Sequence, residues 1–449
     1  MNPTNEEIAE LLRQQLGGEF DVAVSPLVAR GKTKLLFGQE GGNALVYSTD
    51  DITAGDGKLH EILPNKGIWS TQTTSNVFAL LKETGIPVAY NGRVSERIFA
   101  APLCEMIPLE VIARREAHGS YCKRNPHVPT RHVFPKLIFE LFLKTKDKVW
   151  KGQSIPCDDP LMQLVEDGKF ADLYIPNQPL WTQQPFMRIP ISDVFETVDS
   201  VFWIKKIEEL TRKTYLVIEK AFQLLAEHLV DFKIEFGWLP GGGICVADVL
   251  DSDSWRKLRN GAYTDKQIVR DGGRDKMALL AEKYQQTMLL TERFNIPKQR
   301  LIIWRASNTD NVDKLTEAAA IVAPGLETLV VTDSAHKKPV PCYQRLHRLL
   351  QEVPDTVIIS LVGRSNGLGP ILAANCTNPV ITIPANAKEF PEDVWSSLRA
   401  PSANPVLTIL DHENAVLAAF QILAMRNPAL YANLRYRLEE RLTNVVELS

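Results

Sequence analysis

Three segments in the last third of the chain combine hydroxyl, imidazole, amide and cationic groups, and each directly follows an apolar run. They are 306–310 (Ala-Ser-Asn-Thr-Asp), 334–337 (Ser-Ala-His-Lys) and 363–370 (Gly-Arg-Ser-Asn-Gly-Leu-Gly-Pro). Helix starts bind phosphate, a histidine can transfer a proton near neutral pH, and glycines let a ligand approach the backbone. In isolation, 306–310 is more simply an ordinary helix cap. Ligands bind beyond the carboxyl ends of strands in an open α/β sheet. Three ligand-suited loops at strand ends of one sheet therefore favour a binding site more than any one of them does alone.

Two segments near the N-terminus carry charges suited to nucleotide phosphates. Residues 31–34 (Gly-Lys-Thr-Lys) can present backbone N–H groups and two ammonium groups to phosphate oxygens. They lack the GxxxxGK[ST] pattern, and a solvated basic hairpin turn is the simpler explanation in isolation. Residues 50–56 (DDITAGD) set three carboxylates around a hydroxyl and a glycine, which could order a basic substrate group or a metal-bound water. A capped turn explains that spacing equally well.

A further cationic segment lies at 110–124. It contains, in order, Arg114, Arg115, Gly119, Ser120, Lys123 and Arg124. If the chain folds back at the glycine, these groups form a pocket for a carboxylate or phosphate, which arginine binds through two parallel hydrogen bonds. A charged helix face is the commoner outcome for such runs.

Two strand-like segments, 231–236 and 244–250, are joined by a glycine-rich turn and predict a β-hairpin. Alternation along the first strand places Lys233 and Glu235 on one face. Carboxylates on paired strands are suitable ligands for a Mg²⁺ ion that carries nucleotide phosphates. Exposed hairpin charge is the alternative, and it is weaker for Asp248 because the neighbours of Asp248 are apolar.

The elements that must position these groups follow two patterns. Before a boundary at 290–300, short apolar runs, glycines and helical stretches alternate, which indicates a mixed α+β domain. After it, apolar runs recur with helical stretches between several of them, which indicates a parallel sheet covered by helices on both faces. The expected helices are 5–15, 74–83, 205–229 and 274–293, and the expected strands are several within 22–47 and then 86–90, 231–236, 244–250, 301–303, 327–331, 356–362, 379–383 and 405–410. Residues 151–195 show no clear period and are expected to form a long surface connection or an insertion.

Composition and charge exclude several classes of protein. The chain has 449 residues, 45% of them hydrophobic, so it can bury two or three domain cores without disulfides or metals. Its 51 Lys and Arg against 54 Asp and Glu argue against a general polyanion binder. No apolar run reaches the roughly 20 residues that span a bilayer, and the N-terminus does not read as an export signal. Six scattered cysteines lack CxxC spacing and are expected to stay reduced. We therefore expect an intracellular enzyme without nucleic-acid or membrane partners.

In their order along the chain, these motifs resemble those of a bifunctional family of purine-biosynthesis enzymes. The family joins phosphoribosylaminoimidazole-succinocarboxamide (SAICAR) synthetase to phosphoribosylaminoimidazole (AIR) carboxylase. The synthetase-like motifs are GKTKLLF (31–37), DDITAGD (50–56), APLCEMIPLEVIARREAHGSYCKRNP (101–126), DFKIEFG (231–237) and VADVLDSDSWR (246–256). The carboxylase-like motifs are SAHK (334–337), GRSNGLGP (363–370) and VWSSLRAPS (394–402). The resemblance covers nearly the whole chain except 1–19 and most of 150–200.

The resemblance implies a fold and two reactions. It implies an N-terminal extension at 1–19, an α+β, ATP-grasp-like domain of two lobes at 20–270, a linker helix at 271–298, and an α/β three-layer, flavodoxin-like domain at 299–449. The second domain would carboxylate AIR with CO2 to carboxyaminoimidazole ribonucleotide (CAIR). The first would then ligate aspartate to CAIR through an acyl phosphate made from ATP. The cofactors implied are ATP and Mg²⁺, without biotin, and the assembly implied is a cytosolic homo-octamer formed through the second domain.

The resemblance also implies roles for individual residues. In the first domain, the implied ATP ligands are Lys32, Lys34, Glu105 and Met106, and the implied Mg²⁺ ligands are Glu235 and Asp248. The implied catalytic residues there are Arg114 and Arg256, which hold substrate together with Asp51, Ser120 and Lys123. In the second domain, His336 would handle the proton at the carboxylated carbon. The implied substrate ligands around it are Ser307, Asp310, Ser334, Lys337, Arg364, Ser365, Asn366, Gly367 and Gly369.

The second domain departs from the usual family pattern at several glycine positions. Ala306, Lys338 and Ala403 stand where glycine is usual, and Ala373–Ala374 stand where Ser-Gly is usual. Each added Cβ restricts the backbone and fills space beside a ligand. The leading hypothesis is a bifunctional enzyme, because His336 and the 363–370 loop remain. The alternative is an active synthetase whose carboxylase-like domain is mainly an oligomerisation core, and a nucleotide-regulated scaffold without catalysis is more distant.

Overall fold

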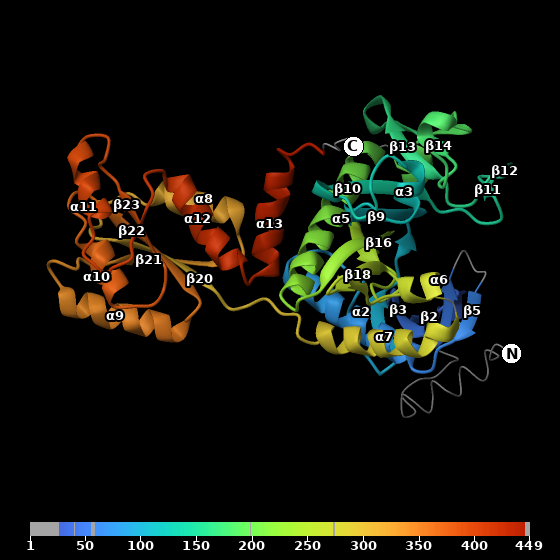
Figure 1. The fold of residues 1–449 in the computed structure, drawn as a ribbon, viewed down its shortest axis with the longest axis horizontal. Helices are drawn as coiled ribbons and strands as arrows, with labels where there is room; N and C mark the ends of the chain where they lie inside the picture. Colours follow the sequence, from blue (N-terminus) through green and yellow to red (C-terminus); the bar gives the residue numbers. More distant parts are fainter. Residues whose placement is uncertain (1–26, 40, 55–58, 198, 273, 445–449) are drawn as a thin grey trace. The chain divides into compact units, whose positions relative to one another are not determined.

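The computed structural model describes residues 27–39, 41–54, 59–197, 199–272 and 274–444 (Figure 1). The chain forms two compact units, one of Met1–Asn295 with Leu438–Ser449 and the other of Ile296–Arg437. The helix expected at 5–15 lies outside the described residues. In the part of the chain that the structure describes, no helix has the length and apolar character needed to cross a membrane.

The first unit contains an antiparallel sheet of five strands in the order β1-β2-β3-β7-β6. These strands are β1 (Leu27–Arg30), β2 (Lys34–Gln39), β3 (Asn43–Ser48), β6 (Gly92–Arg93) and β7 (Ile98–Pro102). Helix α2 (Lys66–Glu83) packs on this sheet, where Phe78 meets Phe99 of β7 edge to face. The helix begins before the expected residue 74 because its first turns bury Ser70 and Thr71, which carry no apolar periodicity. The strand expected at 86–90 is wrong, since only a single bridge from Val88 to Val246 forms there.

A larger sheet of ten strands completes the two-lobed α+β architecture, which is confirmed. Its order is β15-β14-β13-β10-β9-β16-β18-β19, with β8 and β17 also paired to β16. The strands are β8 (Glu105–Met106), β9 (Leu109–Glu116), β10 (Val133–Leu143), β13 (Leu161–Val165), β14 (Phe170–Tyr174), β15 (Met187–Pro190), β16 (His228–Trp238), β17 (Ile244–Ala247), β18 (Trp255–Arg259) and β19 (Ala262–Tyr263). Helix α5 (Ser200–Gln223) covers one face, where the Tyr215 hydroxyl donates to the Leu229 carbonyl at 2.7 Å. The hairpin predicted around Gly241–Gly243 is confirmed as β16–β17.

Of the two expectations for 151–195, the surface connection is wrong, and the insertion is the one that remains. Strands β13, β14 and β15 lie within it and extend the large sheet beyond β10. Each has only four or five residues of mixed polarity, so none shows a clear period of two. The segment is therefore part of the folded sheet.

The remaining helices, strand pairs and turns complete the first unit. They are α3 (Ser120–Arg124), α4 (Ser192–Phe195), α6 (Gln267–Gly272), α7 (Met277–Thr291), the pair β4 (Asp51–Ala54) and β5 (Leu59–Ile62), the pair β11 (Val149–Trp150) and β12 (Gln153–Ser154), and single 3-10 turns at 166–168, 180–182 and 274–276. Helix α7 falls within the expected linker 271–298. Its Leu280 and Tyr284 pack with Ile52 and Leu63 in a buried cluster, so this helix belongs to the core of the first unit.

The second unit is a parallel sheet in the order β21-β20-β22-β23-β24. Its strands are β20 (Arg300–Arg305), β21 (Glu327–Thr332), β22 (Thr356–Val362), β23 (Val380–Pro384) and β24 (Leu407–Thr408), and all pair in parallel. Its helices are α8 (Asp313–Val322), α9 (Pro339–Glu352), α10 (Leu368–Ala374), α11 (Val394–Leu398), α12 (His412–Ala424) and most of α13 (Pro428–Glu439), with one 3-10 turn at 391–393. The last two residues of α13, Leu438 and Glu439, belong to the first unit. In chain order the strands read 2-1-3-4-5, the flavodoxin-like order, so the expected fold is confirmed.

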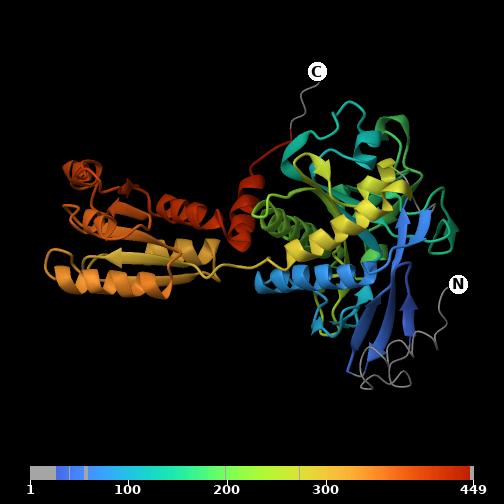
Figure 2. The same cartoon turned by 60° about the horizontal axis from the view of Figure 1, so that its bottom comes forward.

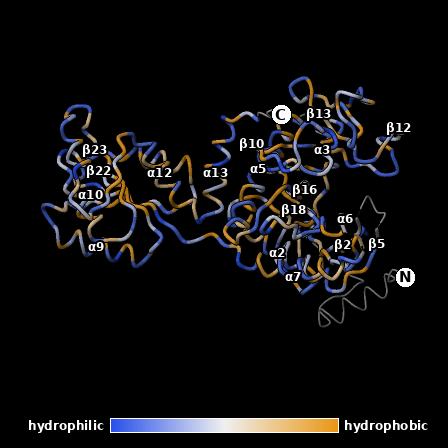
Figure 3. Tube along the Cα trace, in the orientation of Figure 1, coloured by the Kyte–Doolittle hydropathy of each residue, from blue (hydrophilic) through white to orange (hydrophobic). Residues whose placement is uncertain are grey.

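Helices lie on both faces of this sheet (Figure 2), and alternation along the strands builds one core on each face. Leu301 and Ile303 pack with residues of α8 and α12, whereas Ile302 and Trp304 pack with residues of α9 and α10. Because both faces are covered, the central strands are hydrophobic along their length (Figure 3). This burial explains why the apolar runs predicted these strands.

Candidate active sites

A row of charged side chains crosses the large sheet of the first unit. Arg114 of β9 lies opposite Asp231 of β16, and Asp231 lies opposite Arg256 of β18. Both guanidinium groups form ion pairs with the Asp231 carboxylate. On the next strand, Glu140 of β10 accepts a hydrogen bond from Arg114 Nε at 2.6 Å. The structure therefore brings the two predicted catalytic arginines onto one carboxylate.

The chain folds back at Gly119 beside this row. The Ser120 hydroxyl lies 3.5 Å from Arg114 Nη2, so this predicted substrate ligand joins the row. Gly119 has φ +59°, and a Cβ there would lie 2.8 Å from Arg256 Nη2, so the turn requires glycine. The two cations after the turn differ, since Arg124 is buried and paired with a carboxylate whereas Lys123 is exposed.

A second charged cluster gathers around the β16–β17 hairpin. Lys34, at the start of β2, forms an ion pair with Asp248, directly after β17. Burial lowers the pKa of the Lys34 ammonium to about 8, although the nearby Glu235 carboxylate opposes the shift. Burial alone would raise the pKa of Glu235, but the ammonium groups of Lys144 and Lys233 hold it below its usual range. Lys144 Nζ lies 2.5 Å and Lys233 Nζ 3.8 Å from this carboxylate. The cluster thus contains the predicted phosphate ligand Lys34 and both predicted Mg²⁺ ligands.

Other predicted residues of the first unit are more open. Glu105 and Met106 form β8, which pairs with the end of β16, and both side chains are exposed. Lys32 is exposed in the turn between β1 and β2, and Asp51 is half-buried on β4. Neither belongs to the row on Asp231 or to the cluster around the hairpin. Their assigned roles stay predictions.

The structure adds Asp253, which lies inside the quoted motif 246–256 and received no role from the sequence. Its carboxylate lies 3.0 Å from Lys66 Nζ and 3.3 Å from Lys266 Nζ, and accepts a hydrogen bond from Tyr284 at 2.6 Å. Burial alone would raise the pKa of Asp253, but the two lysines hold it well below its usual range. Asp253 therefore ties α2 and α7 to the strand that carries Arg256.

Two further members of the row on Asp231 also escaped prediction. Asp231 lies two residues before Lys233 in a predicted strand, so alternation could have placed it on the same face. Glu140 had no such signal, because 133–143 was not predicted as a strand and its five-residue stretch 138–142 is almost wholly apolar. Only the pairing of β9 with β10 reveals Glu140 as a partner of Arg114.

In the second unit, three loops that follow parallel strands converge. Ser307 and Asp310 follow β20, His336 follows β21, and 363–369 follows β22. A Cβ added to Gly367 would overlap the His336 imidazole, and a Cβ added to Gly363 would lie 3.7 Å from Asp310 Oδ1. These loops lie at the point where the strand order reverses between β20 and β22, the place where such sheets bind ligands. The structure therefore assembles the three segments as expected.

Hydrogen bonds hold the first two loops in shape. The Ser307 N–H donates to Asp310 Oδ2 at 2.9 Å, so these two predicted substrate ligands form one turn. The Ser334 hydroxyl accepts the Lys337 N–H at 3.3 Å. His336 and Lys337 are exposed at this turn, where a ligand can reach them.

The third loop is held by contacts with residues of later segments of the same unit. Asn366 is buried, donates to the Ser397 hydroxyl at 3.1 Å and accepts the Gly369 N–H at 2.9 Å. A Cβ at Gly369 would overlap the hydroxyl of Thr382. Arg364 lies 2.5 Å from the Asp393 carboxylate, and its guanidinium stacks 3.5 Å from the Phe390 ring centroid, while Ser365 is exposed.

The departures from the family pattern mostly spare this site. Lys338 has φ −140° and is exposed, Ala373 packs in the core, and Ala374 is exposed at the end of α10. Ala306 packs partly buried against the same core as Ala373. Ala403 differs, because its φ of +65° lies in the left-handed region that favours glycine. The atoms nearest to a Cβ built at Gly363, Gly367 or Gly369 belong to none of the five.

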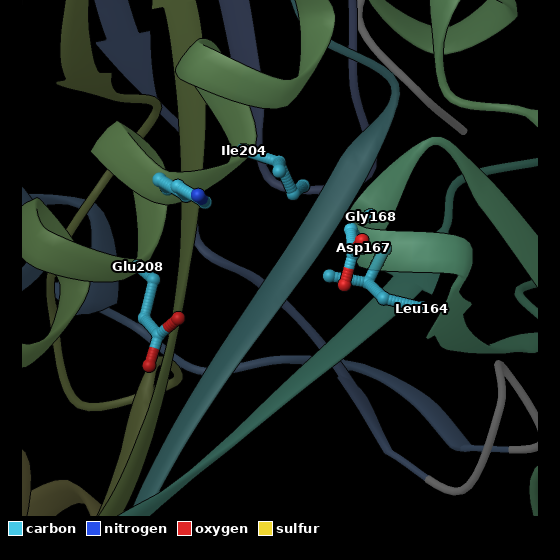
Figure 4. A pocket seen from close by; sticks show the side chains of 6 residues that line it. Leu164, Asp167, Gly168, Ile204 and Glu208 are labelled. Atoms are coloured by element: carbon cyan, nitrogen blue, oxygen red, sulfur yellow. The ribbon is translucent and has the colours of Figure 1, made fainter.

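A separate pocket lies in the first unit, between the turn after β13 and helix α5 (Figure 4). It is lined by Leu164, Asp167, Gly168, Ile204, Lys205 and Glu208. Its lining contains none of the predicted site residues, so it is distinct from both candidate sites.

Comparison with known proteins assigns a family to each unit. Residues 27–156 and 194–288 match the family model of SAICAR synthetase, and 301–443 match that of AIR carboxylase. The unmatched stretch 157–193 holds β13, β14 and β15.

The chain is similar to a "Probable multifunctional protein ADE2" of Caenorhabditis elegans, with 33% identity over 90% of this chain and 91% of the relative. It is 31% identical to the human "Bifunctional phosphoribosylaminoimidazole carboxylase/phosphoribosylaminoimidazole succinocarboxamide synthetase", over 90% of this chain and 91% of the relative. A solved structure of a SAICAR synthetase in complex with ADP is 26% identical, covers 59% of this chain and 96% of its own, and has a TM-score of 0.46. The sequence matches extend over both units, and the chain therefore belongs to the family of bifunctional purine-biosynthesis enzymes that combine AIR carboxylase with SAICAR synthetase.

Proposed function

We propose that the chain catalyses two consecutive steps of purine biosynthesis. The second unit adds CO2 to AIR to give CAIR, and the first unit joins CAIR to aspartate with ATP to give SAICAR, ADP and phosphate. One observation carries this proposal. Each of the two units matches a different family, and each brings its own predicted site residues together. The alternative, a carboxylase-like domain that serves mainly as an oligomerisation core, gains no support from the steric surroundings of His336.

In the synthetase reaction, a CAIR carboxylate oxygen attacks the γ-phosphorus of ATP, and ADP leaves. The amine of aspartate then attacks the acyl carbon, and phosphate leaves. Lys32 and Lys34 bind ATP phosphates, and Glu105 and Met106 contact the adenine. Cationic groups fixed before the reaction stabilise the charge that develops in it. Arg114 and Arg256 supply such groups, because Asp231 holds both in place; Asp51, Ser120 and Lys123 add substrate contacts.

Glu235 and Asp248 suit the protein's share of a Mg²⁺ site. Glu235 lies opposite Ala247 in the hairpin, next to Asp248, and its lowered pKa keeps it ionised. In the described part of the chain, no group of three or more His, Cys, Asp and Glu side chains is arranged to hold a metal. Mg²⁺ bound with a nucleotide needs only one or two carboxylates, since phosphates and water supply the rest. When bound, it neutralises phosphate charge.

In the carboxylase reaction, the electron-rich ring carbon of AIR attacks CO2, and a proton leaves that carbon. His336 removes the proton, which is the main demand this reaction makes on the protein. Ser307, Asp310 and Ser334 bind the ribonucleotide with Lys337 and the 364–369 loop. Because Gly367 has no side chain, the His336 imidazole has room at the place where the loops converge.

Separate assays of the two reactions test this function. AIR with bicarbonate and without ATP should give CAIR, and CAIR with ATP, Mg²⁺ and aspartate should give SAICAR. His336→Ala should abolish the first reaction and spare the second. If the unmodified protein forms SAICAR but no CAIR, the oligomerisation alternative is favoured. Loss of both reactions in His336→Ala would contradict the assignment of the two units. Absence of both reactions in the unmodified protein would favour a non-catalytic scaffold.

We also propose that the protein is a cytosolic homo-octamer assembled through the second unit, as the family resemblance implies. Light scattering of the purified full chain would test the number of subunits. A monomer at micromolar concentration would contradict the assembly without affecting the chemistry of either site.

A further inference from the structure

Glu439 and Asn444 contact the large sheet of the first unit. The side chain of Glu439, the last residue of α13, is fully buried. Its Oε1 accepts a hydrogen bond from Arg115 Nη2 at 2.7 Å, and its Oε2 accepts the Leu137 N–H at 2.9 Å. Oε2 also lies 3.4 Å from Arg212 Nη2 of α5. One carboxylate thus meets β9, β10 and α5 together.

These contacts fall where the ladder between β9 and β10 is interrupted. The two strands pair from Leu143 to Ile138, and the register then shifts before Val133. The Leu137 N–H lies in this gap, and a buried N–H without a partner is costly. Glu439 supplies its acceptor. The Asn444 side chain does the same for the N–H of Lys136, at 3.1 Å.

Glu439 also balances buried positive charge. Arg115 and Arg212 are 5% and 2% exposed, and an unpaired charge at such a depth strongly destabilises a fold. Arg115 is held on its other side by Glu219, 2.7 Å from its Nε. Because successive side chains alternate across a strand, Arg115 faces α5 while Arg114 faces the charged row on Asp231.

We propose that Glu439 is a positioning residue for the synthetase site. It fixes β9 and β10 from the face opposite the substrates, so that Arg114 and Glu140 keep their geometry on the other face. Glu439 and Asn444 therefore serve the first unit, although the match to the AIR carboxylase family extends to residue 443. This inference rests on the proposed synthetase function.

Steady-state kinetics of the full chain carrying Glu439→Gln test the inference. Glutamine keeps the size of the side chain and removes its charge. We expect the KM of the synthetase for CAIR or aspartate to rise about tenfold, because small displacements of a binding group are costly, while the KM for ATP and the carboxylase rate stay unchanged. A purely structural role would instead lower the active fraction, so that kcat falls and every KM stays the same.

Glu440→Gln is the matched control. Glu440 is adjacent and also meets Arg212, 2.7 Å from its Nη1, but its side chain is half exposed. We expect it to leave every constant unchanged. If Glu439→Gln does not fold, Asn444→Ala removes the neighbouring acceptor and should raise the same KM by about twofold.

Three results would overturn the inference. They are a Glu439→Gln enzyme with unchanged synthetase constants, one with a lowered kcat alone, and one whose carboxylase falls in parallel. Absence of synthetase activity in the unmodified chain would refute the proposed function itself, and the inference with it. The unmodified enzyme therefore separates the two kinds of failure.

Discussion

Gly367→Ala tests the geometry of the carboxylase site directly. The backbone at Gly367 has φ −92°, which any residue adopts, so the substitution strains no backbone. The new Cβ would overlap the His336 imidazole, which has to move by more than about 1 Å to regain ordinary contact. Misplacing a reacting group by about 1 Å costs on the order of 100-fold in rate. We therefore expect the carboxylase kcat to fall about 100-fold.

The assay measures CAIR formation from AIR and bicarbonate without ATP, and SAICAR formation from supplied CAIR in the same preparation. SAICAR formation and the melting temperature should not change, because an exposed histidine can rotate without disturbing the core. Gly325→Ala is the matched control, since a Cβ there has no atom within 4 Å. A Gly367→Ala carboxylase within about threefold of the unmodified rate would refute the position assigned to His336.

Three further predictions concern stability. Asp231→Asn leaves Arg114 and Arg256 without the carboxylate charge that they share. The free energy of unfolding of the first unit, measured by urea denaturation, should fall by about 3 kcal/mol. An unchanged midpoint of the urea transition would contradict the pairing of both arginines with Asp231. Burial raises the pKa of Asp265 to about 6, so this group favours the folded state at low pH and loses that contribution as pH rises. From pH 5 to pH 8, the free energy of unfolding of the unmodified protein should fall by about 1 kcal/mol relative to that of Asp265→Asn. A difference in stability between the two proteins that does not change with pH would refute the raised pKa of Asp265. Ala403→Gly relieves a left-handed backbone (φ +65°) and should stabilise the second unit by about 1 kcal/mol in thermal unfolding, whereas destabilisation would contradict that conformation.

The sequence by itself determined most of the second unit. Its strands are buried on both faces, so each reads as a continuous apolar run such as 356–362. A parallel sheet also places the loops after its strands at one edge, which is why 306–310, 334–337 and 363–370 could be assigned to one site. The same reasoning failed for 151–195, where short strands of mixed polarity depend on their neighbours for pairing.

Only the tertiary structure decided the arrangement of the synthetase site. Arg114, Asp231 and Arg256 face one another because of the register of three antiparallel strands, and register follows from the packing of a whole sheet rather than from any local pattern. The place of Glu439 is decided in the same way. Nothing near it in sequence indicates that its carboxylate closes a gap between β9 and β10, because the buried Arg115 and the N–H of Leu137 come together only in the folded sheet.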